Sequence, residues 1–288
     1  MSCQIGLKQD SEDPRKNQKK MKNHKNAIEA IELTHCYNEH PAVDHLSFVV
    51  PKNTIFGLLG PNGAGKSTTI KMLITLLPPT CGTAKVDGFD IVEDALAIRQ
   101  RIGYVPQLIS ADGELTGYEN LLISAKLYGL ARKEREERIK ELLHFMGLTE
   151  YANQLVNQYS GGMIRRLEIA QALLHNPSIL FLDEPTIGLD PSARKMLWTS
   201  IRDWKKQFDT TILITTHDME EADKLCDIVA FMHLGHIIRM DTPKELKDEI
   251  GKNATLDDVF IKHTGTSIEK GEGFSHAREI RRTISRLD

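Results

Sequence analysis

The sequence of 288 residues lacks the features that would place it in an oxidising compartment or inside a bilayer. Its four cysteines are scattered and form no C-x-x-C pair, so we expect reduced thiols rather than disulfides or a thiolate metal site. No apolar run approaches the roughly 18–20 residues that span a bilayer. The first residues also lack the apolar stretch of a secretory signal. We therefore expect a soluble, cytosolic chain; if it acts at a membrane, another chain must supply the membrane-spanning part.

A large excess of charge is also missing. The 37 Lys and Arg oppose 40 Asp and Glu, for a formal net charge of −3, which argues against a globally basic nucleic-acid binder. Positive charge is concentrated in residues 1–26, where seven Lys or Arg stand against three acids with few apolar residues between them. This composition predicts a disordered, solvated basic tail; contact with acidic phospholipid or RNA is the alternative.

Short apolar runs alternate with helical patterns along the rest of the chain, which predicts an α/β fold. Several runs are continuously apolar, as expected for strands buried on both faces of a largely parallel sheet. The expected strands are Ala27–Leu33, Leu46–Val50, Thr54–Leu59, Ile102–Val105, Ile179–Leu182, Thr211–Thr215, Ile228–Met232 and Ile237–Met240. Residues 115–172 break the alternation and predict a helical insertion with helices at Asn120–Leu130 and Lys133–Met146. On the second helix, Glu134 and Arg138 are expected to pair on the outer face.

Residues 60–67, Gly-Pro-Asn-Gly-Ala-Gly-Lys-Ser, match the phosphate-loop pattern G-x-x-x-x-G-K-[ST]. The pattern follows an apolar strand and opens an apolar-periodic helix, Ser67–Leu77, which is the context it requires. Glycines let backbone N–H groups point at phosphate oxygens, and the helix N-terminus adds positive potential. Lys66 is expected to reach the β- and γ-phosphates, and the Ser67 hydroxyl to ligate Mg²⁺. The pattern predicts a site for a nucleoside triphosphate with Mg²⁺, formed by Gly60, Pro61, Asn62, Gly63, Ala64, Gly65, Lys66, Ser67 and Thr68.

Two adjacent acids, Asp183 and Glu184, end another apolar strand. Neighbouring side chains diverge at a strand end, so one acid can face the metal and the other the attacking water. We assign Asp183 to the Mg²⁺ shell and Glu184 to the role of general base. The alternative is an acidic turn after a core strand, because Asp-Glu-Pro is ordinary turn chemistry.

Two further polar residues follow strand ends. His217 could hydrogen-bond the γ-phosphate and orient the water. Gln107 could bind Mg²⁺ through a water molecule and move when the nucleotide leaves. Each of these two assignments is weak by itself. A histidine at a strand end, for example, more often has a structural role.

The segment Tyr159-Ser-Gly-Gly-Met163 lies before the acid pair and is a small-residue turn that opens a helix, which is a further anion site. Together with the phosphate loop, it resembles the ATP-binding cassette family, whose usual signature is L-S-G-G-Q. Ser160, Gly161 and Gly162 match that signature, whereas Tyr159 and Met163 depart from it.

The resemblance covers about residues 27–245 and leaves 246–288 as a C-terminal extension. It implies a P-loop NTPase fold: a RecA-like core with a mixed, largely parallel sheet, a small antiparallel β part and the helical insertion at 115–172. It also implies ATP hydrolysis coupled to transport by a separate transmembrane permease subunit, at the cytoplasmic face of the cell membrane.

The resemblance further implies a head-to-tail dimer, either a homodimer or a pair with another ATPase subunit, with two ATP molecules at the interface. Ser160 and Gly162 would contact the γ-phosphate of the partner's ATP. Carried over position by position, the family's roles fall on Gln107 (the Q-loop residue), Gly188–Asp190 (the D-loop), His217 (the switch histidine) and Tyr37 (the aromatic that stacks on adenine).

Finer strings resemble the daunorubicin-resistance and multidrug type of exporter ATPase, namely Tyr159–Met163, Gly188–Pro191 and Leu256–Phe260. A plain amphipathic helix turn is the alternative for the last string. The rival function is a soluble cassette ATPase that acts on ribosomes or nucleic acid, which only the basic tail supports. A single phosphate loop and the lack of sustained heptads disfavour it, so we expect no nucleic-acid partner. A regulator without turnover is disfavoured because Glu184 and His217 are both present.

Overall fold

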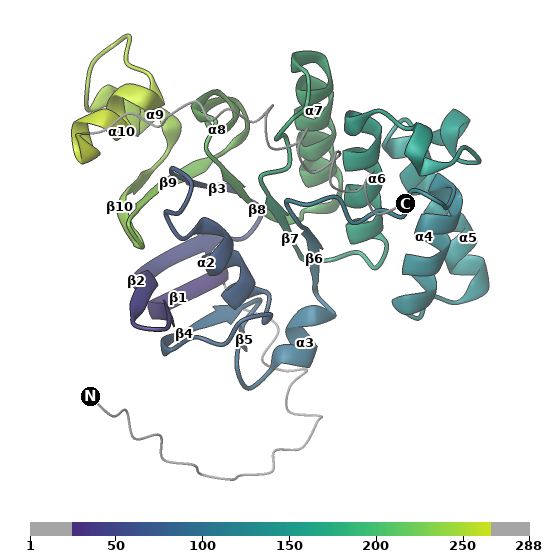
Figure 1. Ribbon diagram of the computed structural model, residues 1–288, viewed down its shortest axis with the longest axis horizontal. Helices are drawn as coiled ribbons and strands as arrows, with labels where there is room; N and C mark the ends of the chain where they lie inside the picture. The colour runs from purple at the N-terminus through teal and green to yellow at the C-terminus, as the bar shows by residue number, and fades with distance from the viewer. Residues whose placement is uncertain (1–24, 266–288) are drawn as a thin grey trace.

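The computed structural model describes residues 25–265, so most of the predicted basic tail and residues 266–288 lie outside the described residues. Its strands form two sheets (Figure 1). The smaller sheet is antiparallel, in the order β2-β1-β4-β5. Its strands are β1 (Asn26–Tyr37), β2 (His40–Pro51), β4 (Cys81–Val86) and β5 (Phe89–Asp90). The first two contain the predicted strands, whereas β4 and β5 were not predicted.

The larger sheet has the order β10-β9-β3-β8-β7-β6, and all its neighbours are parallel except β9 and β10. Its strands are β3 (Ile55–Leu59), β6 (Ile102–Val105), β7 (Ile179–Asp183), β8 (Thr211–Thr216), β9 (Ile228–His233) and β10 (His236–Asp241). All six were predicted to within one or two residues. The two sheets together confirm the expected α/β fold with a mixed, largely parallel sheet and a small antiparallel part.

The central strands are buried on both faces, which explains their unbroken apolar sequences. Alternate side chains enter two different cores. In β3, Phe56 and Leu58 pack toward the antiparallel sheet and the helix α2 (Lys66–Leu73), whereas Ile55 and Leu59 pack toward the helices on the opposite face.

Helices supply the layers around the larger sheet (Figure 1). Between β6 and β7 lie α4 (Gly117–Leu127), α5 (Arg132–Phe145), two 3-10 turns (Thr149–Tyr151, Val156–Gln158) and α6 (Gly161–Leu173). The other helices are α3 (Ala95–Arg99), α7 (Pro191–Phe208), α8 (Met219–Leu225), α9 (Pro243–Asp248) and α10 (Leu256–Thr264). Leu246, Val259 and Phe260 of α9 and α10 are buried in the same core as the helical segment, so residues 243–264 pack onto the cassette.

One expected ion pair is wrong. Arg138 does not lie on the outer face of α5 beside Glu134 but is buried, with 8% of its surface exposed. Its guanidinium donates to the carbonyl oxygens of Leu173 (3.0 Å) and Leu174 (3.4 Å) and pairs with Glu141 (2.6 Å). The unpaired carbonyls at the C-terminus of α6 attract a cation more strongly than a solvated carboxylate does.

Candidate active site

The phosphate loop joins β3 to α2, as the sequence predicts, and its shape depends on glycine. Gly65 has φ +105°, and a Cβ there would lie 2.4 Å from the carbonyl oxygen of Ala42. A Cβ on Gly60 would lie 2.1 Å from the carbonyl oxygen of Met232. Gly63 also has a positive φ, +80°, but is open to space. The glycines therefore let the loop lie directly against the backbone of β2 and β9. The helix α2 begins at Lys66, immediately after Gly65.

Lys66 is buried and points back into the loop. Its Nζ donates to the carbonyl oxygens of Gly60 (2.7 Å) and Pro61 (3.2 Å). The same ammonium lies 3.2 Å from Glu184 Oε1, and both side chains are about 6% exposed. A cation and an anion that were predicted from motifs 118 positions apart therefore form a buried ion pair.

Asp183 sits at the end of β7 beside the phosphate loop. Its Oδ1 accepts hydrogen bonds from the hydroxyls of Ser67 (3.1 Å) and Thr215 (2.5 Å). A serine hydroxyl next to a carboxylate is the oxygen donor set that Mg²⁺ takes in phosphate-loop sites, where substrate phosphates and water complete the shell. Residues 25–265 hold no cluster of three or more His, Cys, Asp or Glu placed to bind a metal. Ser67 and Asp183 supply two oxygen donors of the kind that Mg²⁺ prefers, so the pair fits an Mg²⁺ ion that a nucleotide also holds.

Glu184 also contacts His217, whose Nδ1 lies 2.8 Å from Glu184 Oε2. Burial by itself raises the pKa of Glu184, but the hydrogen bond with His217 and the charge of Lys66 outweigh it, and the pKa is lowered. The hydrogen bond with Glu184, opposed by burial, raises the pKa of His217 above its ordinary value. Glu184 is thus ionised at neutral pH, which is the form that a general base requires.

The backbone at Glu184 is strained, with φ +49° in a residue that is not glycine. Its N–H donates to the carbonyl oxygen of Thr215 (3.1 Å) and to the Thr215 hydroxyl (3.0 Å). Such conformations persist only where the surroundings hold them, and they concentrate at functional sites. Here the strain lets consecutive acids point to different partners, Asp183 to Ser67 and Glu184 to Lys66.

Two further residues that were predicted to contact the nucleotide lie at the ends of strands. Tyr37 ends β1, 47% of its surface is exposed, and its ring packs edge-on against the ring of His35. Gln107 follows β6 with its side chain exposed, while its carbonyl oxygen accepts a hydrogen bond from Arg165 (2.8 Å).

The signature residues lie at the start of α6. Ser160 is the N-cap of this helix and is exposed; its Oγ accepts a hydrogen bond from the backbone N–H of Met163 (3.3 Å). Gly162 faces α7, where a Cβ would come within 2.8 Å of Ala193 Cβ. No hydrogen bond joins Ser160 or Gly162 to the phosphate loop among residues 25–265. Tyr159, which departs from the usual signature, is buried and donates from its hydroxyl to the carbonyl oxygen of Tyr151 (2.6 Å).

Three residues of the site were missed. Thr215 holds both acids, and the buried pair Arg165 and Glu168 connects α6 to the segments around Gln107 and Glu184. Thr215 had a faint signal, because a hydroxyl interrupts the apolar side chains of β8. The i,i+3 spacing of Arg165 and Glu168 is that of an ordinary surface pair.

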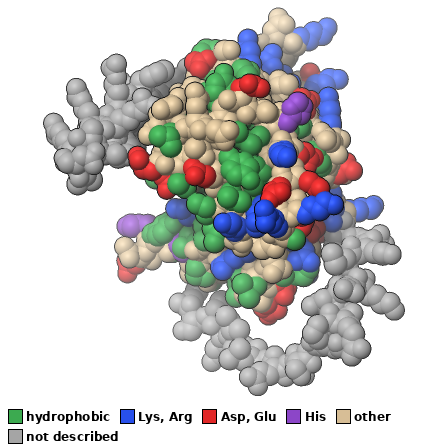
Figure 2. Space-filling model, turned by 90° about the vertical axis from the view of Figure 1, so that its right-hand side faces the viewer, with side chains coloured by type: hydrophobic (Ala, Val, Ile, Leu, Met, Phe, Trp, Pro, Cys, Tyr) green, Lys and Arg blue, Asp and Glu red, His purple; other side chains and the backbone are tan. Residues whose placement is uncertain are grey.

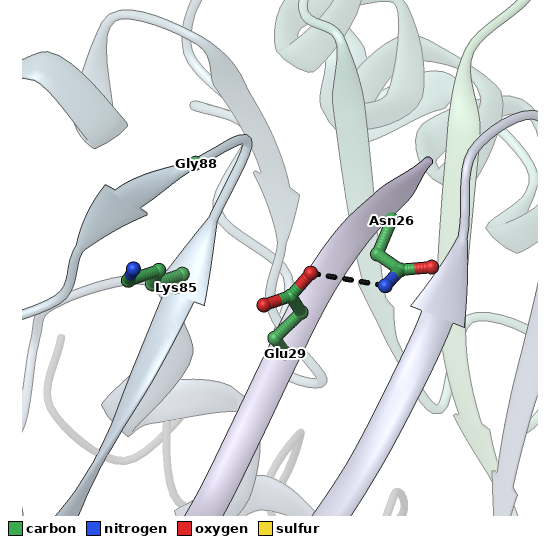
Figure 3. A pocket seen from close by; sticks show the side chains of 4 residues that line it. All are labelled: Asn26, Glu29, Lys85 and Gly88. Carbon is green, nitrogen blue, oxygen red and sulfur yellow. Dashed lines mark hydrogen bonds between the residues drawn. The ribbon is translucent and has the colours of Figure 1, made fainter. Parts of the chain in front are cut away.

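A small cavity of about 30 Å³ lies elsewhere, on the antiparallel sheet, and is lined by Asn26, Glu29, Lys85 and Gly88 (Figure 3). Asn26 Nδ2 donates to Glu29 Oε1 (2.9 Å) along one wall. This volume holds about two or three water molecules, so the cavity is not a nucleotide site.

Comparison with known proteins agrees with this geometry. The family model described as "ABC transporter" matches residues 43–187. The daunorubicin/doxorubicin resistance ATP-binding protein DrrA of Streptomyces peucetius is 45% identical over 227 residues, which cover 79% of this chain and 68% of that protein. The Nod factor export ATP-binding protein I of Sinorhizobium fredii is 46% identical over 223 residues, covering 77% of this chain and 65% of that protein. The chain thus spans about two thirds of the length of these relatives.

Solved structures share the fold. An ATP-binding subunit of an ABC transporter superposes with a TM-score of 0.73 at 30% identity, covering 83% of this chain and 99% of that one. A dimeric ATP-binding cassette, described as a post-hydrolysis state bound to ADP and Pi, gives a TM-score of 0.67 at 25% identity and covers 75% of this chain and 98% of that one. With a phosphate loop, an acid pair and a strand-end histidine in one site, the chain belongs to the ABC transporter family, as one of its ATP-binding and ATP-hydrolysing cassettes.

Proposed function

We propose that this chain is the ATP-hydrolysing subunit of an ABC exporter. The observation that supports this proposal is a set of contacts between segments that are far apart in the sequence. Lys66 pairs with Glu184, Ser67 donates to Asp183, and His217 contacts Glu184. In this proposal the phosphate loop binds the triphosphate, with Lys66 at the β- and γ-phosphates.

Ser67 and Asp183 would hold Mg²⁺, which neutralises charge on the phosphates when bound. Gln107 joins this shell through water in the proposal. The Glu184 carboxylate takes the proton of the attacking water in this proposal, and its lowered pKa keeps it ionised before that step. His217 orients Glu184 through their hydrogen bond, and Tyr37 stacks on the adenine with its exposed ring.

We assign the transport step to a separate membrane subunit. The relatives named above are a drug-resistance protein and an export protein, which supports export. None of the helices within residues 25–265 combines the length and the apolar character needed to cross a bilayer. The loop before α4 and the helix itself expose Leu108, Ile109, Ile123 and Leu127. Figure 2 shows hydrophobic side chains on the side of the molecule that carries α4 and α5, which suits docking to a partner at the cytoplasmic face of the membrane.

The exposed Ser160 and the start of α6 are proposed to complete the ATP site of a second subunit in a head-to-tail dimer. A solved cassette with the same fold is a dimer, which supports this arrangement. A Ser160→Ala variant mixed with a Lys66→Ala variant tests it. One of the two composite sites in a mixed dimer carries both substitutions and the other carries neither, so we expect turnover to recover on mixing. Mixtures no more active than the separate variants would exclude the shared site.

The role of Glu184 is tested by Glu184→Gln, which keeps the size of the side chain and removes its basicity. We expect ATP binding to be retained, turnover to be nearly abolished, and a closed dimer to accumulate with ATP, measured by light scattering. Glu221→Gln is the matched control, because Glu221 is equally buried but its Oε1 accepts a hydrogen bond from the Trp198 indole (2.9 Å), whereas Glu184 pairs with Lys66 and His217. Normal turnover in Glu184→Gln would contradict the general-base assignment.

A further inference from the structure

The guanidinium of Arg165 connects three segments that approach the site from different directions. Arg165 lies in the first turns of α6 and is 5% exposed. Its Nη1 and Nη2 donate to the carbonyl oxygens of Pro106 (2.8 Å) and Gln107 (2.8 Å). Its Nε donates to the carbonyl oxygen of Pro185 (3.0 Å), the residue directly after Glu184. One side chain therefore joins α6, the loop after β6 and the turn after β7.

Glu168, one turn further along α6, completes this connection. Its Oε2 accepts a hydrogen bond from Arg165 Nη1 (2.9 Å), and its Oε1 accepts from the backbone N–H and the hydroxyl of Ser110. The segment 106–110 is thus held at both ends, by Arg165 at Pro106 and Gln107 and by Glu168 at Ser110. Between these anchors, Leu108 and Ile109 are more than 60% exposed.

This geometry requires arginine. The planar fork presents N–H groups in several fixed directions, whereas a lysine ammonium is a single point charge on a flexible stem. All the acceptors except the Glu168 carboxylate are backbone carbonyl oxygens, so the contacts fix the path of the chain rather than one side chain. A charge as buried as Arg165 is costly unless it is paired and hydrogen-bonded, and Glu168 provides the pair.

We propose that Arg165 is a positioning residue for ATP hydrolysis, which fixes the Gln107 loop and the Glu184 turn to α6 as one unit. The proposal rests on the hydrolysis assigned above to Glu184. Through Arg165, a displacement of α6 moves both the loop and the turn, and so changes the placement of the catalytic carboxylate. Within residues 25–265 no hydrogen bond or ion pair joins Arg165 to the phosphate loop, so we expect the loop to keep its affinity for nucleotide.

The test replaces Arg165 with Lys, which retains the charge and loses the fork. The matched control is Arg138→Lys, because Arg138 is also buried, also pairs with the glutamate three residues later and also donates to backbone carbonyl oxygens. Arg138 differs in that it joins α5 to the end of α6 and reaches neither 106–110 nor Pro185. The readouts are kcat, the Kd for ATP in a Glu184→Gln background, and the midpoint of thermal unfolding.

We expect Arg165→Lys to lower kcat by about tenfold or more, as a displaced catalytic group does, with the Kd for ATP changed less than about twofold. Arg138→Lys should lower the unfolding midpoint similarly and leave kcat near that of the wild type. Equal kcat values for the two variants, measured well below their midpoints, would overturn the proposal. A wild-type protein without turnover would instead refute the proposed function.

A second pair of variants tests the proposal in case the Arg165→Lys protein does not fold. Glu168→Gln leaves Arg165 in place and weakens both anchors that Glu168 supplies, the pair with Arg165 and the hydrogen bonds from Ser110. Glu141→Gln is the same chemical change beside Arg138, at a carboxylate that is half exposed. We expect Glu168→Gln to lower kcat and Glu141→Gln to leave it unchanged. Unchanged kcat in both would overturn the proposal.

Discussion

Replacing Lys66 with Met tests whether the buried ion pair with Glu184 contributes to stability before any nucleotide is added. Methionine preserves the length and the apolar stem of the lysine, so packing changes little. At the Nζ–Oε1 distance of 3.2 Å, Coulomb's law with an effective dielectric constant of about 20 gives an attraction of roughly 5 kcal/mol. The substitution also removes the cost of burying the ammonium, so we expect a net loss of about 3 kcal/mol, the lower end for breaking a buried pair.

The loss should depend on pH, because His217 is the second cation beside Glu184. The raised pKa of His217 means that its imidazole is charged in mildly acidic solution and neutral in alkaline solution. With Lys66 removed, the Glu184 carboxylate still faces a cation near pH 5.5 but none near pH 8.5. We therefore expect the penalty to be largest at high pH and to fall to about 1 kcal/mol near pH 5.5.

Equilibrium urea unfolding at pH 5.5 and pH 8.5 measures the free-energy difference directly. Lys71→Met is the matched control, because Lys71 lies on the exposed side of the same helix and should change stability by less than about 0.5 kcal/mol. The reasoning is refuted if Lys66→Met destabilises no more than Lys71→Met, or if its penalty is the same at both pH values.

Two further predictions concern the nucleotide contact and the signature. Tyr37→Ala should weaken ATP affinity by about 1 kcal/mol without changing the Mg²⁺ response, as titration calorimetry would show, and unchanged affinity would exclude stacking. Gly117→Ala should destabilise by about 1–3 kcal/mol, because its Cβ would lie 2.2 Å from Tyr159 Oη, whereas Gly113→Ala, with 3.6 Å to its nearest neighbour, should be tolerated. Tyr159→Phe removes that hydroxyl and should recover part of the loss in the double variant; additive losses in thermal unfolding would contradict the clash.

Continuous apolar runs made the central strands predictable, whereas the mixed sequences of β4 and β5 did not identify them as strands. β6, β7 and β8 are buried on both faces, so their sequences carry an unambiguous signal. β4 was missed because only two of its six residues are buried and it contains glycine and lysine. Arg138 was misplaced because a charged residue on a polar helix is ordinarily solvated, and only the fold brings the end of α6 against it.

The same distinction separates the predicted site residues from the missed ones. Lys66, Asp183 and Glu184 belong to short motifs at strand ends, and parallel strands bring such ends to one edge of a sheet. Arg165 donates to the backbone carbonyl oxygens of Pro106 and Pro185. Every residue has a backbone carbonyl, so the sequence does not show which residues accept these hydrogen bonds. Residues that act on backbone atoms at long range therefore need the structure to be found.

The sheet order explains how a helical segment can be inserted beside the site without disrupting it. β8 lies between β3 and β7, with Leu59 opposite Thr216 and Asp183 opposite Thr215. The phosphate loop and the acids are thus two strand spacings apart, about 10 Å, a gap that Lys66 and Thr215 bridge. β6, in contrast, is the edge strand and pairs with β7, so the chain leaves the sheet and returns to it at one edge. The helical segment can then shift without breaking the contacts of Lys66, and Arg165 is the polar link through which that shift reaches Pro185 and the catalytic turn.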